Sequence, residues 1–176
     1  MKKFTEIDAA TQGFIAQQHV FFVATAAPDG RVNVSPKGQD SLRILGPNRL
    51  VWLNLTGSGN ETAAHLRESP RITIMLCAFE GRPNILRLYG TGTVLHPRDA
   101  GWDELIGLFP PLPGARQLIV VAVDLVTTSC GMAVPLLDFQ AERDELNRSM
   151  LKKDVPQYWA DRNQVSLDGK PTGIQA

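Results

Sequence analysis

Apolar and polar residues alternate along most of the chain between residues 20 and 130, and turn residues interrupt the pattern at short intervals. The segment HVFFVATAAPDGRVNVSPKG contains a β-rich run, a Pro-Asp-Gly turn and the alternating residues Val32 and Val34, which together predict a hairpin. SLRILGPNRLVWLNLT repeats this arrangement, and RITIMLCAFE and NILRLYGTGTVL follow as two further strands. RQLIVVAVDLVTTSC is the longest β-branched run and the best candidate for a central strand. The pattern predicts a mainly β protein of about six antiparallel strands, in a closed or split barrel.

Helical patterns are short and lie between or after these strands. Residues 8–18 form the first, with Asp8 as its cap, and residues 61–67 form the second, which Pro70 ends. Residues 98–108 give a third, before a proline-rich loop. We therefore expect one split-barrel domain over residues 1–176, with a helical C-terminal extension at about residues 138–165.

Composition and charge narrow the class of protein. The 176 residues contain 18 Lys plus Arg and 18 Asp plus Glu, and neither sign forms a block that would bind nucleic acid or an anionic membrane. No apolar stretch approaches the roughly 20 residues of a membrane helix, and the N-terminus does not have the pattern of a secretory signal. Cys77 and Cys130 are the only cysteines. They give no disulfide framework, so we expect a cytoplasmic protein.

The most informative stretch is NLTGSGNETAAHLRESPRITIM, where a glycine-rich loop, residues 56–62, precedes the second predicted helix. Free backbone N–H groups and the positive end of a helix dipole favour an anion at such a place. Ser58, Asn60 and Thr62 would add side-chain donors. The alternative is a purely local role, in which Ser58 or Asn60 caps the helix and the glycines serve only the turn. The loop matches neither a Walker loop nor a dinucleotide-binding GxGxxG fingerprint.

Three segments, VNVSPKG, RLVWLNLTGSGNETAAHLRESPRITI and ILRLYGTGTVL, resemble the pyridoxamine 5′-phosphate oxidase-like superfamily of split barrels. The resemblance covers about residues 14–124 and implies a six-stranded antiparallel split β-barrel that is mainly β with short helices. It also implies a homodimer that holds FMN near the subunit interface and acts on a small molecule. Carried over by position, Lys37 ends the second strand close to the flavin, Thr56 closes the strand before the phosphate loop, and Arg87 lies in the sequence RLYG.

The chain departs from the oxidases where their phosphate loop carries Ser-Arg-Lys, because it has Asn60-Glu61-Thr62 instead. The loss of two cations weakens the expected hold on a phosphate dianion, although Arg67 or Arg71 could contribute. The oxidases' C-terminal Arg-x-His motif is also absent, so pyridoxamine phosphate oxidation is not expected.

The expected function is that of an FMN-binding flavoprotein and oxidoreductase on an unidentified small molecule. Its cofactor-binding residues would be the set Lys37, Thr56, Ser58, Asn60, Thr62 and Arg87. The alternatives are a deazaflavin coenzyme or haem on the same fold, or a non-enzymatic flavin-binding or sensing module.

Other reactive residues give weaker signals. The three histidines, at positions 19, 65 and 96, lack metal-ligand spacing, so no metal site is expected. Cys130 ends the long strand, but no histidine or acid at a diagnostic spacing would activate it. The catalytic residues are therefore unknown. Trp52 is expected in the core or at an interface, and Arg87 either contacts the cofactor or faces outward from its strand.

Overall fold

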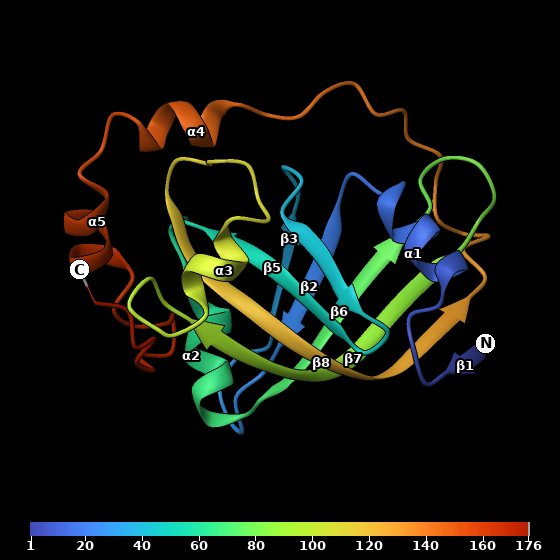
Figure 1. The fold of residues 1–176 in the computed structure, drawn as a ribbon, viewed down its shortest axis with the longest axis horizontal. Coiled ribbons are helices and arrows are strands. Elements are labelled where there is room, and N and C mark those ends of the chain that lie inside the picture. Colours follow the sequence, from blue (N-terminus) through green and yellow to red (C-terminus); the bar gives the residue numbers. More distant parts are fainter. Residues whose placement is uncertain (176) are drawn as a thin grey trace.

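The computed structural model describes residues 1–175, and Figure 1 shows a strongly curved antiparallel sheet with short helices at its edges. The strands are β1 (Lys2–Phe4), β2 (Phe21–Thr25), β3 (Asn33–Lys37), β4 (Leu42–Gly46), β5 (Arg49–Leu55), β6 (Arg71–Cys77), β7 (Ile85–Leu95) and β8 (Ala115–Ser129). The helices are α1 (Ala9–Ala16), α2 (Glu61–Glu68), α3 (Trp102–Ile106), α4 (Glu145–Met150) and α5 (Val155–Arg162). The expectation of a mainly β antiparallel fold with short helices is confirmed.

The sheet has eight strands, so the expected number of six is wrong. Seven follow the order β3-β2-β6-β7-β8-β5-β4, and β1 pairs separately with β8. Within residues 1–175, β3 and β4 do not pair with each other, so the sheet is not closed. β1 escapes prediction because its three residues are all exposed and show no apolar alternation. β8 is central, as expected, since it pairs with β1, β5 and β7.

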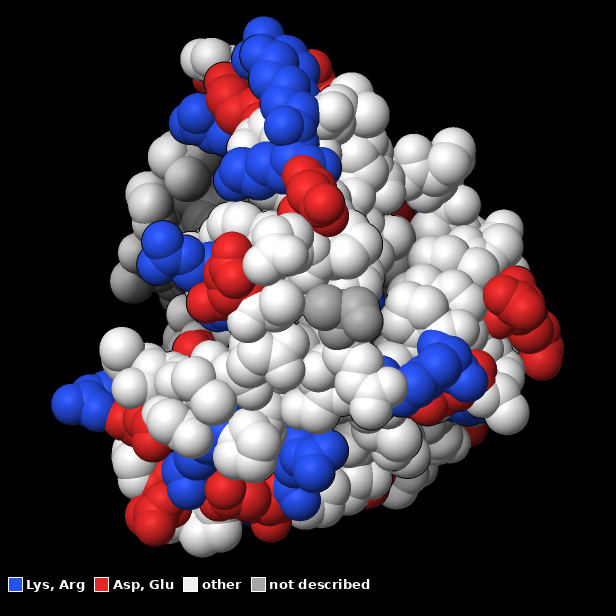
Figure 2. Space-filling model, turned by 90° about the vertical axis from the view of Figure 1, so that its left-hand side faces the viewer, with Lys and Arg blue, Asp and Glu red and all other residues white. Residues whose placement is uncertain are grey.

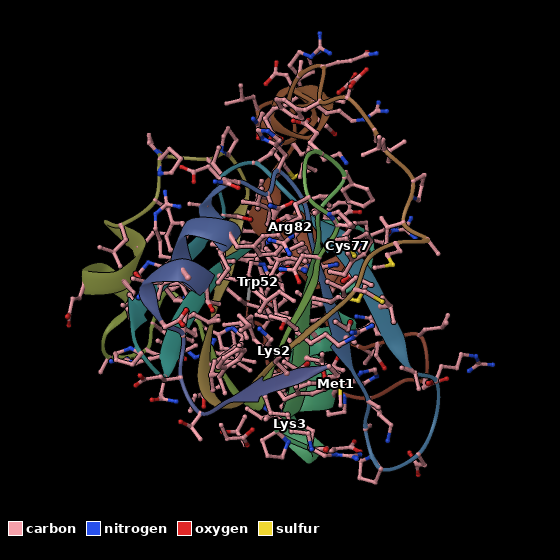
Figure 3. The ribbon with its side chains drawn as sticks, turned by 90° about the vertical axis from the view of Figure 1, so that its right-hand side faces the viewer. Met1, Lys2, Lys3, Trp52, Cys77 and Arg82 are labelled. Atoms are coloured by element: carbon pink, nitrogen blue, oxygen red, sulfur yellow. The ribbon has the colours of Figure 1, made fainter. Side chains whose placement is uncertain are left out.

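Strand β5 buries side chains on both of its faces. Leu50 and Trp52 enter the larger hydrophobic cluster with residues of β2, β6, β7 and β8. Val51 and Leu53 enter a smaller cluster, in which α3 and Phe109 cover the outer face. Trp52 is fully buried, and Figure 3 shows it in the interior among the strands, so its expected core position is confirmed.

The helix ends follow local sequence signals. The carboxylate of Asp8 accepts a hydrogen bond from the backbone N–H of Thr11 at 2.7 Å, so the predicted cap of α1 is present. Asp154 caps α5 in the same way through the N–H of Gln157. Asn60 is the N-cap residue of α2, but its side chain makes no capping hydrogen bond. The expectation that the Asn60 side chain caps α2 is therefore wrong.

After β8 the chain forms a long connection that crosses one end of the sheet to reach α4 and α5 (Figure 1). We call residues 131–144 the arm. Figure 2 shows the face that carries the chain's C-terminal part, where Lys and Arg lie beside Asp and Glu without a broad area of one sign. No helix in the described part of the chain has both the length and the apolar character to cross a membrane.

Candidate functional site

A cavity of about 1110 Å³ lies where the ends of several elements meet. The end of α1, the end of β3 with the residues after it, the end of β5 and residues 79–81 contribute to its wall, and the arm and α4 complete it. Its apolar lining includes Val20, Leu53, Leu55, Phe79, Phe139 and Leu146. The volume suits a drug-sized or cofactor-sized ligand, and apolar walls with few polar groups are typical of such sites.

Lys37 is the cationic side chain that β3 brings to this cavity. Its ammonium lies 5.3 Å from the centre of the Trp52 ring. Desolvation by burial, followed by the positive charge of Arg116, lowers the pKa of Lys37 to about 8. Glu80, Asp138 and Glu142 also line the cavity, but among the described residues no carboxylate forms an ion pair with Lys37.

Thr56 also lines the cavity, but its hydroxyl already makes two hydrogen bonds within the protein. The hydroxyl donates to the carbonyl oxygen of Gly114 and accepts from the indole N–H of Trp159, each at 2.8 Å. Trp159 belongs to α5, so the C-terminal part of the chain lies directly against the glycine-rich loop. The proton of the Thr56 hydroxyl is therefore not free for a ligand in this arrangement.

Asn163, at the end of α5, is the centre of this contact and is fully buried. Its side chain donates to the carbonyl oxygen of Gly57 at 3.1 Å and accepts from the guanidinium of Arg116 at 2.8 Å. Its backbone oxygen accepts from the side-chain amide of Asn60 at 3.4 Å and from the hydroxyl of Thr172 at 2.6 Å. The glycine-rich loop is thus fastened to the last part of the chain.

Arg116 is a buried cation that the sequence analysis did not identify as a site residue. It is 2% exposed and donates to the backbone oxygen of Gly59 at 3.1 Å in addition to Asn163. Its Nε has no partner among the described residues, and burial lowers its pKa to about 10, partly offset by Tyr158. The only sequence signal was a charged residue at the start of an apolar strand.

The remaining predicted cofactor residues lie outside the lining of the large cavity. Ser58 is exposed on the loop. Thr62 is buried in the first turn of α2, with its hydroxyl 3.5 Å from the side-chain nitrogen of Asn33. Arg87 is partly buried on β7 and donates to the hydroxyl of Ser129 at 3.3 Å. The structure therefore brings Lys37 and Thr56 to the cavity and leaves Ser58, Asn60, Thr62 and Arg87 outside its lining. The role of all six residues stays a prediction.

The arm is held to the rim of the cavity at several points. The rings of Phe139 and His19 stack with centroids 3.6 Å apart, and the backbone N–H of Phe139 donates to Glu80. Farther along, Glu142 accepts from the backbone N–H of Gln39 at 3.2 Å. Gln39 has a positive φ of 58°, a conformation uncommon for residues other than glycine. The arm is thus a wall of the site rather than a detached extension.

Neither cysteine joins the cavity lining. Cys77 is buried, and burial raises the pKa of its thiol despite the nearby charge of Arg87. Cys130 is exposed at the end of β8 and faces solvent as a free thiol. His65, on α2, is buried and lies 3.1 Å from the hydroxyl of Thr25, so it serves the contact between α2 and β2.

Comparison with known proteins places this fold in a family. Residues 7–130 match the family model described as pyridoxamine 5′-phosphate oxidase. The pyridoxamine 5′-phosphate oxidase family protein ustO of Aspergillus flavus is 39% identical over 177 residues, which cover 88% of this chain and 71% of that protein. The chain belongs to the pyridoxamine 5′-phosphate oxidase family. The match to the family model ends at Cys130, so the arm and the two C-terminal helices lie beyond it.

Solved structures agree with this family's fold. A variant of HupZ from Group A Streptococcus superposes with a TM-score of 0.55 at 20% identity, over 70% of this chain and 99% of that one. A proposed pyridoxamine 5′-phosphate oxidase from Lactobacillus delbrueckii gives a TM-score of 0.55 at 16% identity, over 72% of this chain and 99% of that one. At such identities the likeness supports the family's split-barrel type of fold and carries no function.

Proposed function

We propose that this member of the pyridoxamine 5′-phosphate oxidase family binds FMN in the large cavity and acts as an oxidoreductase on an unidentified small molecule. The observation that carries the proposal is Lys37, a desolvated cation without an acidic partner among the described residues, in a cavity of about 1110 Å³ with largely apolar walls. A half-buried, desolvated cation of this kind is stabilised by an anion. An apolar wall suits the flat ring system that FMN carries beside its phosphate.

The chain's own residues would position the cofactor. Lys37 would offset phosphate charge, and the backbone N–H of Gly57, the loop residue beside Thr56 in the cavity lining, would donate to a phosphate oxygen. Leu53, Leu55 and Phe139 would exclude water from the ring. The bound ring would supply the electron and hydride transfer, and the protein would supply orientation and electrostatics. Fully neutral donors at positions 60 and 62 imply weaker phosphate binding than an Arg-Lys pair would give.

The first experiment is an absorbance spectrum of the purified protein, followed by a fluorescence titration of the stripped protein with FMN. We expect flavin bands or saturable quenching of FMN fluorescence. A haem or deazaflavin spectrum without FMN binding would contradict the proposed cofactor. Bound flavin that neither NADH nor NADPH reduces would favour the sensing module over the oxidoreductase.

Replacing Lys37 with glutamine tests the residue that carries the proposal. We expect the Kd for FMN to rise by about tenfold to a hundredfold, because a hydrogen bond to a charged group contributes about 1.5–3 kcal/mol. Lys152→Gln, at an exposed turn after α4, removes the same charge away from the cavity and should leave the Kd unchanged. An equal Kd for the original protein, Lys37→Gln and Lys152→Gln would show that Lys37 does not contribute to FMN binding.

The affinity for FMN should also depend on pH. The pKa of Lys37 is lowered to about 8 in the folded protein without ligand, so its ammonium loses a proton as the pH rises through that region. The anion favours the protonated form, so the Kd should be lowest below pH 8 and should increase above it. FMN titrations between pH 6.5 and 9.5 measure this, and Lys37→Gln should flatten the rise.

We further propose that the protein is a homodimer with the cofactor near the subunit interface. The support is the homodimer that the family resemblance implies, together with exposed apolar side chains at the edge strand β3 and on the arm. Val32 and Val34, beside and within β3, are 70% and 61% exposed, and Met132 and Leu136 on the arm are 82% and 77% exposed. Light scattering after size-exclusion chromatography tests this. A mass equal to one chain would contradict it.

A further inference from the structure

A second hollow, of about 410 Å³, lies on another part of the molecule. It forms between the end of α2, the end of β7 with the residues that follow it, and Thr172 near the C-terminus. Arg67, His96, Arg98 and Asp99 line it. It shares no lining residue with the large cavity, so it is a separate feature that the proposed function does not use.

Positive charge exceeds negative charge around this hollow. The positive charges of Arg67 on α2, Arg98 after β7 and Arg116 on β8 each lower the pKa of His96. Asp99 is the one acid whose charge raises it. Asp99 is already engaged, because it accepts the backbone N–H of His96 at 2.8 Å and lies 3.9 Å from Arg98. Two guanidinium groups, those of Arg67 and Arg98, therefore line the hollow with a single carboxylate, Asp99.

His96 supplies the second observation. The residue is only 6% exposed and lines the hollow, yet its Nδ1 has no hydrogen-bond partner among the described residues. Buried polar atoms in native proteins are normally satisfied, and an exception calls for an explanation such as a ligand. Desolvation, and then the charges of Arg98, Arg67 and Arg116, lower the pKa of His96, while Asp99 raises it.

We propose that this hollow binds the phosphate or carboxylate group of a small molecule, with Arg67 and Arg98 as its cationic contacts and the imidazole ring of His96 as a hydrogen-bond partner. Guanidinium groups match oxyanions through paired N–H donors. Arg98 also donates to the backbone oxygen of Gly173 at 2.9 Å, which fixes its side chain at the rim. The proposed oxyanion site does not depend on FMN binding, because it is lined by residues that do not line the large cavity.

Histidine NMR offers a direct test, since the chain has only three histidines and His96→Asn identifies the relevant signal. The full-length protein would be titrated with inorganic phosphate and separately with succinate, with sodium chloride as the ionic-strength control. We expect the His96 ring signal to move with at least one oxyanion, and its titration midpoint to shift to higher pH because a nearby anion favours imidazolium. Which of the two is effective distinguishes a phosphate site from a carboxylate site.

The variant Arg98→Gln should raise the Kd for that oxyanion by at least about tenfold. Arg49→Gln, at the exposed start of β5, loses the same charge away from the hollow and should bind like the original protein. Arg67→Gln is the second variant, in case the loss of the contact to Gly173 unfolds the first. No response of the His96 signal to phosphate or succinate, or an equal response in Arg49→Gln and both hollow variants, would overturn the site.

Discussion

Asn163→Ala is expected to lower the free energy of unfolding by about 3 kcal/mol. The substitution removes the oxygen that accepts from Arg116 at 2.8 Å and the nitrogen that donates to Gly57 at 3.1 Å. Asn163 is fully buried, so water cannot replace these partners without the structure opening. The main cost comes from leaving the buried Arg116 guanidinium with fewer acceptors, because its Nε already lacks one among the described residues.

Urea unfolding followed by tryptophan fluorescence would measure this loss. Gln164→Ala is the matched control: the neighbouring side chain is exposed and donates only to the backbone oxygen of Trp159, so its truncation should change stability by no more than about 0.5 kcal/mol. Equal midpoints for the two variants would mean that the contact between the C-terminal part and the glycine-rich loop contributes little to the folded state.

Gly90→Ala is expected to be at least as damaging, with a loss of about 3 kcal/mol or more. A Cβ at Gly90 would overlap the carbonyl oxygen of Ala122 and would lie 2.9 Å from its carbonyl carbon. Both are backbone atoms of the neighbouring strand, so no side-chain rotation relieves the overlap. The register between β7 and β8 shifts between Tyr89 and Gly90, so the close approach coincides with an irregularity in the pairing.

Gly13→Ala is the same chemical change as Gly90→Ala, but it is expected to stabilise the protein. Gly13 lies inside α1, and a Cβ there would meet no atom within 4 Å. Alanine should therefore stabilise the protein by about 0.5–1 kcal/mol through its higher helix propensity. Thermal unfolding of the two variants side by side measures both effects. A Gly90→Ala protein as stable as the original would show that β7 and β8 can move apart at this point without loss of stability.

The fold was predictable where local chemistry determines it. Asp8 marks the start of α1, Pro70 follows the end of α2, and the β-branched run from residue 116 gives the central strand β8. β1 was not predictable, because its pairing with β8 depends on a partner more than 120 residues away and not on its own three exposed residues. β1 therefore accounts for one of the two strands by which the expected six fell short of eight.

Only part of the site was accessible to sequence reasoning. Lys37 and Thr56 are at strand ends that meet in the folded sheet, and the structure brings both to the cavity. Asn163 and Trp159 were not anticipated, since a charged, weakly amphipathic segment gives no sign of which distant loop it will contact. Arg116 was missed because its isolation from carboxylates emerges only when burial and neighbours are known.

The contact between Asn60 and Asn163 joins residues 103 positions apart, which has a consequence for the order of events during synthesis. The ribosome adds about 5–20 residues per second, so the glycine-rich loop leaves the translation machinery roughly 5–20 seconds before the residue that fastens it. During that interval the loop's backbone donors are accessible from the side that α5 later covers. A ligand of the loop can therefore reach it before the last helix packs onto it.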